Sequence, residues 1–338
     1  MNRTSSLNLL IVIVNYRTPG LTIDCLHSLE AECRSVAGWR VRVVVTDNCS
    51  GDDSVARLEK AVGDNGLGDW VSIEPLERNG GFAYGNNAAI RPALESGTPP
   101  DYVWLLNPDT IVRPGALLAL VDFLEDHPDV GIAGSRLVNL EGTAEWSAFR
   151  FPTVLGELEG GVRLGLVTRI LSRWVISSPA PLVASRCDWS SGASLMIRRA
   201  VFDAIGLLDE NYFMYFEEVD FCLRAHKAGW AAWYVPESEV VHLAGQSSGL
   251  SDQQRAGKRL PGYWFQARRY YNKKHLGPVR TLLANVCWTL GFSSFRVRQW
   301  LFRKPDTDPK SMLRDFLRFN FFPNGSVSIK QCNDRELP

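Results

Sequence analysis

The sequence predicts an α/β fold built on a mostly parallel sheet, and three observations support this class. In the first half of the chain, short apolar runs alternate with segments that have helical periodicity, which is typical of strand–helix–strand units. The apolar runs are nearly continuous, as expected for strands that are covered on both faces. A polar, turn-forming loop follows each of the first four runs. These features predict a sheet flanked by helices, with a ligand site at one edge.

Five strands and four helices follow from this pattern. The expected strands are Leu9–Val14, Val41–Thr46, Val71–Glu74, Tyr102–Leu106 and Gly131–Ala133. The expected helices are Thr22–Ala37, Ser54–Val62, Gly85–Leu94 and Gly115–His127. Residues 141–186 are less regular and contain Pro152, Pro179 and Pro181, so we expect an insertion or flap there.

The loops that follow the strands predict where ligands bind, because parallel strands present their carboxyl ends at one edge of a sheet. The loops read N-Y-R-T-P-G (15–20), D-N-C-S-G-D-D (47–53), R-N-G-G-F-A-Y-G-N-N (78–87) and N-P-D-T (107–110). One such loop is an ordinary turn, whereas four on one edge indicate a binding site. Neither G-x-G-x-x-G nor G-x-x-x-x-G-K-[ST] occurs, which disfavours classical dinucleotide and P-loop sites.

The composition is that of a folded globular chain. Its 338 residues, 45% hydrophobic and 22% charged, suit one large domain with an appendage or two domains. Seven scattered cysteines without a C-x-x-C pair favour reduced thiols in a cytosolic setting and give no metal-cluster signal. The N-terminal residues show no cleavable signal pattern. The longest late apolar run, Leu282–Phe292, is shorter than the roughly 20 residues that cross a bilayer.

The net charge of zero conceals a strong separation of charge along the chain. Residues 1–252 carry 20 Lys and Arg against 32 Asp and Glu, whereas residues 253–305 carry 12 Lys and Arg and no acid. This basic stretch also holds ten of the chain's aromatic side chains, among them Trp264, Phe265, Tyr270, Tyr271, Trp288, Phe292, Phe295, Trp300 and Phe302. The combination predicts an element that lies on an anionic membrane surface. Packing against the acidic body and nucleic-acid binding are the alternatives, and no motif supports the latter.

The segment 211–230 combines aromatic side chains with three carboxylates. Its acids are Glu217, Glu218 and Asp220. Carboxylates next to the aromatic residues of 212–216 are costly unless they begin a helix, meet a cation or do chemistry. The structural alternative is a helix start, because the helix dipole favours acids in the first turn. Asp220 is also spaced for an ion pair with Arg224.

Two further features favour an active site. Asp109 follows an apolar strand, where a lone acid typically holds a divalent cation that also contacts phosphate oxygens; its structural alternative is a helix cap ahead of Pro114 and Gly115. His242 follows Val240 and Val241, and alone it would more often be a buried, hydrogen-bonded histidine than a ligand. Together with the acid pair, these residues indicate catalysis.

Seven motifs mark the chain in the following order. They are V-N-Y-R (14–17), T-D-N-C-S-G-D (46–52), R-N-G-G-F-A-Y-G-N-N (78–87), L-L-N-P-D-T (105–110), S-G-A-S-L-M-I-R-R (191–199), Y-F-E-E-V-D-F-C-L-R (215–224) and V-V-H (240–242). In this order they resemble glycosyltransferase family 2, most closely its bacterial rhamnosyltransferase-like branch, over residues 8 to about 250. The resemblance implies a GT-A fold, with a nucleotide-binding half (1–138), an acceptor half (139–250) and a helical, membrane-proximal extension (251–338).

The resemblance also implies roles for individual residues. The nucleotide would be bordered by Val14, Asn15, Arg17, Asp47, Asn79, Asn86 and Asn107, with Asp47 accepting a hydrogen bond from its pyrimidine ring. Donor sugar or acceptor would contact Trp189, Gly192 and Asp220. The metal, Mg²⁺ or Mn²⁺, would be held by Asp109 and His242. Glu218 would be the catalytic base, with Glu217 positioning the acceptor. The chain departs from the family where N-P-D replaces D-x-D, and where Glu replaces a frequent Asp at the base position.

The implied activity is an inverting, metal-dependent transfer of a sugar, L-rhamnose from dTDP-L-rhamnose, to a hydroxyl of a lipid-linked or growing cell-surface glycan. The enzyme would work in the cytoplasm, peripherally on the inner face of the cell membrane. Alternatives are a UDP-sugar-dependent transferase of the same family, a non-catalytic sugar-nucleotide or glycan-binding module, and a membrane scaffold. A sugar nucleotidyltransferase would need a basic, glycine-rich loop after the first strand, where Arg17 is the only cation.

Overall fold

The computed structural model describes residues 6–36, 38–177, 179–243 and 258–322. The chain forms two compact units, each of which is discontinuous in sequence. The first contains the described residues of 1–148, 179–210 and 217–247, and the second those of 149–178, 211–216 and 248–338. The segments 149–178 and 211–216 thus belong to the same unit as the described residues of 248–338.

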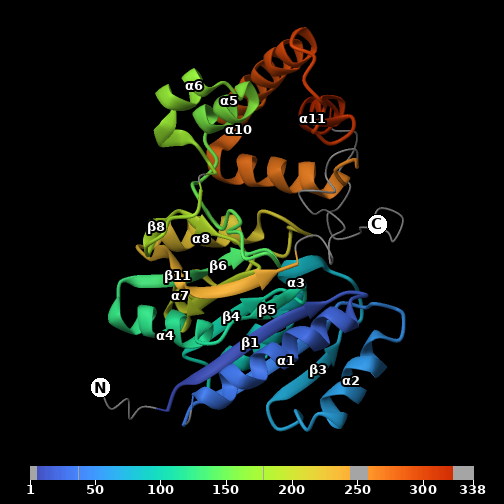
Figure 1. Cartoon of the computed structure of the whole chain (residues 1–338), viewed down its shortest axis with the longest axis vertical. Coiled ribbons are helices and arrows are strands. Elements are labelled where there is room, and N and C mark those ends of the chain that lie inside the picture. Colours follow the sequence, from blue (N-terminus) through green and yellow to red (C-terminus); the bar gives the residue numbers. More distant parts are fainter. Residues whose placement is uncertain (1–5, 37, 178, 244–257, 323–338) are drawn as a thin grey trace. The chain divides into compact units, whose positions relative to one another are not determined.

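A mixed, mostly parallel sheet of nine strands forms the centre of the first unit (Figure 1). The strand order is β3-β2-β1-β4-β10-β6-β11-β5, with β8 paired to β11; β10, β5 and β8 run against the other six. The strands are β1 (Asn8–Asn15), β2 (Arg40–Asp47), β3 (Val71–Pro75), β4 (Tyr102–Leu106), β5 (Thr110–Val112), β6 (Val130–Val138), β8 (Ser185–Cys187), β10 (Ser194–Arg198) and β11 (Ala231–His242). Two shorter strands, β7 (Ala148–Phe149) and β9 (Trp189–Ser190), lie outside this sheet.

All nine predicted strands and helices are present. The helices of the first unit are α1 (Pro19–Ser35), α2 (Ser54–Asp64), α3 (Gly81–Leu94), α4 (Ala116–Asp126), α7 (Arg199–Ile205) and α8 (Glu217–Lys227). Two of them begin earlier than predicted. Helix α1 starts at Pro19, because the N–H that proline lacks has no intrahelical partner in the first turn. Helix α3 starts at Gly81, whose φ of 84° suits glycine.

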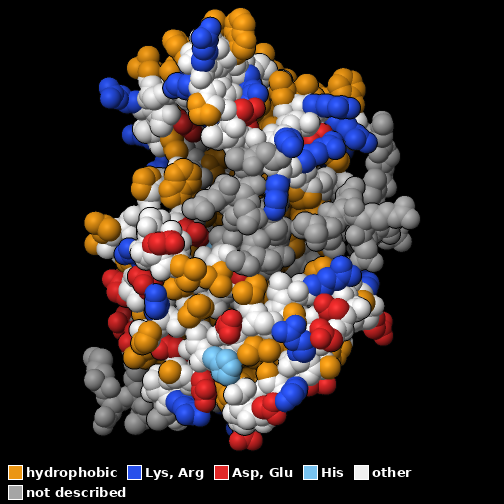
Figure 2. Space-filling model, turned by 45° about the vertical axis from the view of Figure 1, so that its right-hand side comes forward, with side chains coloured by type: hydrophobic (Ala, Val, Ile, Leu, Met, Phe, Trp, Pro, Cys, Tyr) orange, Lys and Arg blue, Asp and Glu red, His pale blue; other side chains and the backbone are white. Residues whose placement is uncertain are grey.

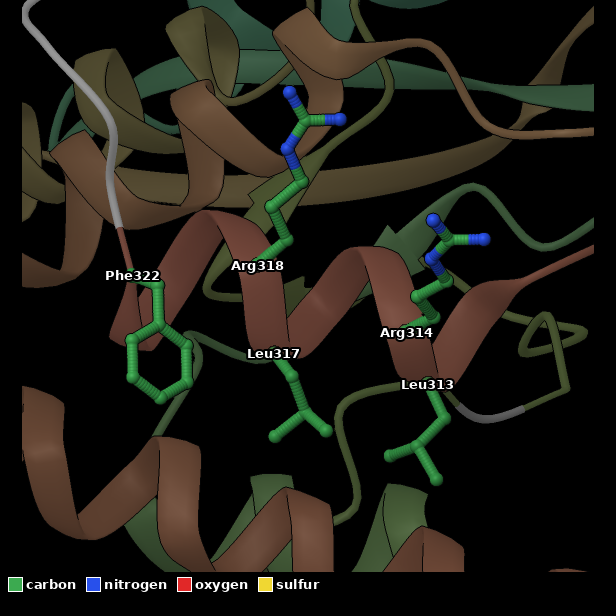
Figure 3. Close-up of a pocket in the computed structure, with 5 residues that line it drawn as sticks. All are labelled: Leu313, Arg314, Leu317, Arg318 and Phe322. Carbon is green, nitrogen blue, oxygen red and sulfur yellow. The ribbon is translucent and has the colours of Figure 1, made fainter.

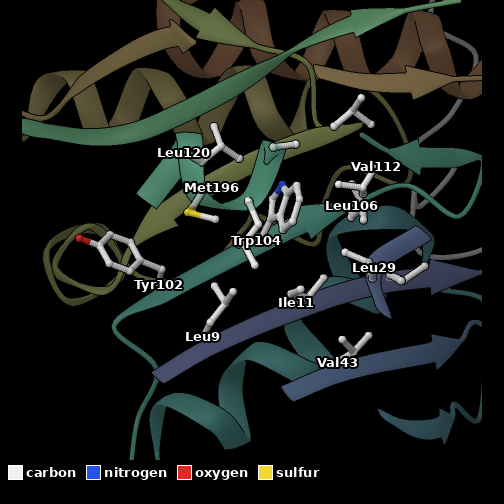
Figure 4. Packing of buried hydrophobic residues seen from close by; sticks show 14 of the residues in the cluster. Leu9, Ile11, Leu29, Val43, Tyr102, Trp104, Leu106, Val112, Leu120 and Met196 are labelled. Carbon is white, nitrogen blue, oxygen red and sulfur yellow. The ribbon is translucent and has the colours of Figure 1, made fainter. Parts of the chain in front are cut away.

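Both faces of the sheet are covered, which explains the nearly continuous apolar runs. Leu9 and Ile11 of β1 join Leu29 of α1 in one buried cluster (Figure 4). On the opposite face, Val14 lies against Gly85 of α3, where a Cβ would come within 2.6 Å of Val14 Cγ1. Helix α3 can therefore approach β1 this closely because residue 85 is glycine.

The pairing of the strands places polar residues at one edge of this sheet. Asn15 pairs with Asp47 at the carboxyl ends of β1 and β2. Strand β10 starts with Ser194 opposite Leu106, the last residue of β4. Strand β5 starts with Thr110 opposite His242, the last residue of β11. The loops that the sequence analysis singled out therefore meet at this edge, hereafter the polar edge.

The second unit is helical. It contains α5 (Val154–Val162), α6 (Gly165–Ile170), the 3₁₀ turn η1 (Ser172–Trp174), α10 (Gly262–Leu301) and α11 (Met312–Phe321). Helix α10 is interrupted at Gly277, whose φ is 76°, ahead of Pro278. Within the described ranges, no helix combines the length and the apolar composition needed to cross a bilayer.

The basic aromatic stretch contributes to the core of this unit, which corrects part of its interpretation as a membrane surface. Phe265, Trp288 and Phe292 are buried together with Phe316 of α11, and Tyr271 is 1% exposed. These aromatic side chains pack within the second unit, and burial in its core leaves them no contact with lipid. Residues 253–257 of the stretch lie outside the described residues.

Candidate active site

Hydrogen bonds between polar side chains fix the loops after β1 and β2. The buried Asn15 donates through Nδ2 to Asp47 Oδ2 at 2.7 Å and accepts at Oδ1 from Thr22 Oγ1 at 3.0 Å. The Asp47 carboxylate also accepts from Ser50, at 2.9 Å from the backbone nitrogen and 2.6 Å from Oγ. Arg17 has a φ of 57° and donates from its backbone N–H and its Nε to Ser50. Asn15 and Asp47 therefore hold the shape of this loop.

Asn48 joins the loop after β2 to the start of α3. Its Nδ2 donates to Asn79 Oδ1 at 2.9 Å and to the carbonyl of Gly81 at 3.1 Å. Asn86 lies within α3, where its Nδ2 donates to the carbonyl of Phe82 at 2.9 Å. The buried Oδ1 of Asn86 has no hydrogen-bond partner among the described residues. Asn79 thus belongs to a fixed loop, and the oxygen of Asn86 is available to a ligand.

Asp109 and His242, the two predicted metal ligands, lie together at the polar edge. Asp109 is 1% exposed, and its Oδ1 lies 3.6 Å from His242 Nε2. The other ring nitrogen of His242, Nδ1, lies 3.4 Å from Oε2 of Glu145. Burial lowers the pKa of His242, but the hydrogen bond with Glu145 and the charges of Asp109 and Glu145 raise it more, so that its pKa is above 6.5.

The donor set of Asp109 and His242 fits one divalent cation. Ligand atoms that each lie about 2.0–2.2 Å from an ion can be at most about 4.4 Å apart, and the 3.6 Å separation lies within this limit. Among the described residues, no three His, Cys, Asp or Glu side chains are grouped closely enough to hold a metal by themselves. The remaining ligands would therefore come from the substrate or from water, as is usual for Mg²⁺ at phosphate sites.

The two acids that begin α8 have different surroundings. Glu217 is 4% exposed, and its Oε2 has no hydrogen-bond partner within the described part of the chain. Burial and the neighbouring charge of Glu218 raise the pKa of Glu217 well above its usual range, although a backbone hydrogen bond partly opposes the shift. Glu218 is half-buried. The raised pKa favours a proton on Glu217.

A short series of contacts connects Glu218 to the polar edge. The backbone N–H of Asn107 donates to the carbonyl of Ala193 at 3.0 Å. Gly192 directly precedes Ala193. A Cβ on Gly192 would lie 3.4 Å from the ring of Phe82 and 3.7 Å from the Cβ of Glu218. The start of α8, the start of α3 and the loop after β4 therefore converge within the first unit.

The backbone before the acid pair is strained. Tyr215 and Phe216 both have a φ of 71°, which is uncommon for residues other than glycine and costs about 1–3 kcal/mol each. Their rings pack within the second unit, with the Tyr215 ring 6.1 Å from Tyr263 and the Phe216 ring 5.5 Å from Tyr271. The aromatic segment is thus held in place by α10, and it leads directly into Glu217.

Three residues predicted to border donor sugar or acceptor have distinct settings. Asp220 is fully buried and pairs with Arg224 Nε at 2.8 Å. Arg224 also donates to the carbonyls of Ile205 and Leu207, so the ion pair anchors α8 to the end of α7. Trp189 is half-buried at the start of β9. Gly192 lies close to Glu218, since a Cβ on this glycine would be 3.7 Å from the Cβ of Glu218.

Two residues that complete this arrangement were not assigned from the sequence. Asn48 lies within the motif T-D-N-C-S-G-D, so its position in a polar loop was a usable signal. Glu145 lies in the irregular region after β6, and no motif marks it. Only the fold brings its carboxylate to His242.

The second unit contains a hollow of about 580 Å³. It is lined by Leu313, Arg314, Leu317, Arg318 and Phe322 (Figure 3). The leucines and arginines point to different sides of α11. None of the predicted site residues lines this hollow.

A family model and curated relatives both identify this chain as similar to glycosyltransferases. Residues 8–258 match the model of the family described as glycosyltransferase like family 2. An N-acetylglucosaminyl-diphospho-decaprenol L-rhamnosyltransferase of Mycobacterium tuberculosis is 32% identical over 194 residues, which cover 53% of this chain and 61% of the relative. The rhamnosyltransferase WbbL of Escherichia coli is 31% identical over 170 residues, covering 48% and 61%. The chain thus spans about three-fifths of the length of these two relatives.

Solved structures give the fold. A mannosyltransferase from Pyrobaculum calidifontis, solved with GDP-Man and Mn²⁺, superposes with a TM-score of 0.57 at 13% identity over 90% of this chain and 77% of that one. GalNAc-T7, solved with UDP, GalNAc and Mn²⁺, gives 0.56 at 15% identity, covering 93% and 55%. These similarities confirm the predicted GT-A arrangement of a mixed sheet flanked by helices. With the family model matched over residues 8–258, the chain belongs to glycosyltransferase family 2.

Proposed function

We propose that the chain is an inverting glycosyltransferase that moves L-rhamnose from dTDP-L-rhamnose to a hydroxyl of a lipid-linked glycan. The observation that carries this proposal is the position of Glu218, which is connected through Gly192 and Ala193 to Asn107. A potential base and a potential metal site therefore lie at the same edge of one sheet. A binding module without catalysis would not need a buried acid pair, which is costly to the fold.

The two acids have complementary roles in this proposal. Glu217, whose pKa is raised by burial and by its neighbour, keeps its proton and helps to orient the acceptor. Glu218 carries the negative charge of the pair and takes the proton from the acceptor hydroxyl. The hydroxyl oxygen forms a bond to the anomeric carbon as the bond from that carbon to the diphosphate breaks. A single displacement from the opposite face inverts the anomeric centre.

Asp109 and His242 would hold Mg²⁺ or Mn²⁺, and their 3.6 Å separation suits a shared cation. A bound cation would offset the charge that develops on the departing diphosphate. Glu145 would orient the His242 ring through Nδ1, as carboxylates do for many metal-bound imidazoles. The loops that hold Asn15, Arg17, Asp47, Asn79 and Asn86 would bind the nucleotide, together with Val14 and Asn107.

The relatives support the choice of donor and acceptor. The protein from Shigella flexneri called dTDP-rhamnosyl transferase RfbF is 24% identical over 271 residues, which cover 79% of this chain and 78% of that protein. The M. tuberculosis relative is named for an acceptor that joins N-acetylglucosamine to decaprenol through a diphosphate. We therefore propose a polyprenyl-diphosphate-linked sugar as the acceptor. A UDP-sugar donor is the competing assignment within the same family.

The proposal is tested by thermal shift and by turnover. We expect dTDP and dTDP-rhamnose to raise the melting temperature in the presence of Mn²⁺ more than UDP or UDP sugars do. Asp109→Ala should abolish the dependence on metal. Glu218→Gln should leave nucleotide binding intact and lower kcat about 10²–10⁴-fold, the usual contribution of a positioned base.

The outcomes separate the alternatives. Preferential stabilisation by UDP sugars would keep the mechanism and replace the donor. If the protein is folded and no nucleotide changes its melting temperature, the transferase proposal is contradicted and the membrane scaffold is favoured. Unchanged turnover in Glu218→Gln would remove Glu218 from the role of base.

A further inference from the structure

The second segment of α10, after the interruption at Gly277, is apolar on two opposite faces. One face is packed against α5: a Cβ on Gly291 would lie 2.8 Å from the backbone nitrogen of Val162, and a Cβ on Gly161 would lie 2.7 Å from the carbonyl oxygen of Trp288. Trp288 and Phe292 on this face are buried in the core of the unit. A surface helix normally has a single apolar face, which packs against the core. In this segment of α10, that face is already covered by α5.

The other face carries a line of exposed aliphatic side chains, hereafter the outer stripe. It consists of Val279, Leu283, Val286, Leu290, Val297 and Leu301, with exposed fractions of 69%, 50%, 37%, 65%, 57% and 60%. At about 100° per residue, these positions lie within roughly 60° of arc. Leu282 and Trp300, which are 54% and 78% exposed, widen it to roughly 100°. Ser293 and Ser294 separate the stripe into two groups, 279–290 and 297–301. Scattered single exposed residues are ordinary, but exposed apolar side chains grouped on one face of a helix mark an interaction surface.

The charges around the outer stripe identify its partner. The segment of α10 after Gly277 contains three arginines and no acid: Arg280, Arg296, which pairs with Asp306, and Arg298. Arg280 and Arg298 lie on one flank of the stripe, about 100° from its centre. In the upper part of Figure 2, hydrophobic and basic side chains lie next to one another. A second copy of the chain would bring like charges together across the stripe, whereas an anionic surface complements them.

We propose that the outer stripe inserts into the interfacial region of an anionic phospholipid bilayer, with α10 lying in the plane of the membrane. An apolar face flanked by Arg, with Trp at one end, is an arrangement that binds such interfaces. The hollow on α11 offers the same chemistry, because Leu313, Leu317, Arg314 and Arg318 line it (Figure 3). The inference deepens the proposed function, since it explains how the enzyme would reach a lipid-linked acceptor.

The experiment is sedimentation of the full chain with vesicles, without donor or acceptor, so that it is independent of transferase activity. One vesicle contains equal parts of phosphatidylglycerol and phosphatidylethanolamine, and the other contains phosphatidylcholine alone. We expect at least fivefold stronger partitioning to the anionic vesicles, weakened by 0.5 M salt. The triple variant Leu283→Gln, Leu290→Gln, Val297→Gln should reduce partitioning at least tenfold. Its fold should survive, because all three side chains are at least half-exposed.

The matched control is the double variant Leu118→Gln, Leu140→Gln in the first unit, where the two leucines are 41% and 67% exposed. It should bind anionic vesicles within twofold of the unmodified chain. Equal partitioning by the triple variant, or failure of the folded unmodified chain to bind, would overturn the proposal. So would light scattering that shows a dimer dissociated by the triple variant while vesicle binding is absent, because the stripe would then be a contact between copies of the chain.

Discussion

Two parts of the first unit differ in whether their buried polar groups have hydrogen-bond partners. In the loops after β1 and β2, Asn15, Asp47 and Ser50 satisfy one another through short hydrogen bonds. At the start of α8, Glu217 is buried next to a second carboxylate, and its Oε2 has no hydrogen-bond partner among the described residues. The first arrangement stabilises the fold. The second destabilises it.

The difference shows which residues form the scaffold and which are available for chemistry. A polar group whose bonds are all internal can define the shape of a pocket but has little capacity left to change its protonation. A buried acid with a raised pKa favours its neutral form, which suits the role of orienting the acceptor that is proposed for Glu217. The strained backbone at Tyr215 and Phe216, directly before this pair, adds a second local cost that a purely structural helix start does not require.

The largest expected effect on stability is at Asp47. Asp47→Ala should lower the free energy of unfolding by about 2–4 kcal/mol, because it leaves Asn15 Nδ2 and the two donors of Ser50 without their acceptor. Urea unfolding monitored by circular dichroism measures this loss. Asp53→Ala, at a side chain that is 73% exposed, should change stability by less than about 0.5 kcal/mol. Equal losses in both variants would show that the Asp47 network is not a scaffold.

The next effect concerns Glu145 and the binding of metal. Glu145→Gln removes the charge that faces Nδ1 of His242 at 3.4 Å. Loss of such a supporting carboxylate typically weakens metal affinity about 10–100-fold. Isothermal titration of Mn²⁺ in the presence of dTDP measures the affinity. The exposed Glu141 provides the control Glu141→Gln, and an unchanged affinity in Glu145→Gln would limit Glu145 to a structural role.

Substitution of Glu217 should raise the free energy of unfolding, whereas substitution of Asp47 should lower it. Its folded-state pKa is raised, so the folded chain binds more protons than the unfolded chain above the unfolded pKa of about 4.3. Stability from this group is complete below that pH and is lost as the pH rises through the folded pKa. Glu217→Gln should therefore raise the free energy of unfolding by about 1–2 kcal/mol at pH 8, with little effect at pH 4.

Urea midpoints at the two pH values measure this change. Glu59→Gln, at an exposed residue of α2, should leave the dependence on pH as it is. A variant at Glu217 that is less stable at pH 8 than the unmodified chain would mean that the buried carboxyl has favourable interactions, and the contrast with Asp47 would fail.

The sequence predicted well those features that follow from local patterns. Continuous apolar runs are typical of strands covered on both faces, and all five predicted strands are present. The polar residues after these strands meet because parallel strands end at one edge. Strands β5 and β10 were not predicted, because their antiparallel positions depend on pairing with β11 and β4 far along the chain. Glu145 was missed for the same reason, since only long-range folding brings it to His242.

The basic aromatic stretch shows where composition is insufficient. Twelve cations and ten aromatic side chains in residues 253–305 suggested one continuous surface. The fold buries Trp288 and Phe292 and leaves Leu283 and Leu290 exposed. All four residues lie on one helix, and only the packing of α5 against one side decides which face remains open. Periodicity describes an apolar face but does not say whether protein or lipid will cover it.

The smallest expected effects on stability come from substitutions at two glycines that flank the site. A Cβ on Gly192 would make ordinary contacts, at 3.4 Å from Phe82 and 3.7 Å from Glu218, whereas a Cβ on Gly85 would lie 2.6 Å from Val14 Cγ1. Gly192→Ala should therefore change the free energy of unfolding by less than about 0.5 kcal/mol. Gly85→Ala should lower it by about 1 kcal/mol, because overpacking against β1 exceeds the gain in helix propensity. Thermal melts with and without dTDP and Mn²⁺ measure both. If Gly192→Ala keeps its stability but loses turnover, the space beside Glu218 is needed by substrate, whereas full activity would exclude close contact between substrate and this glycine.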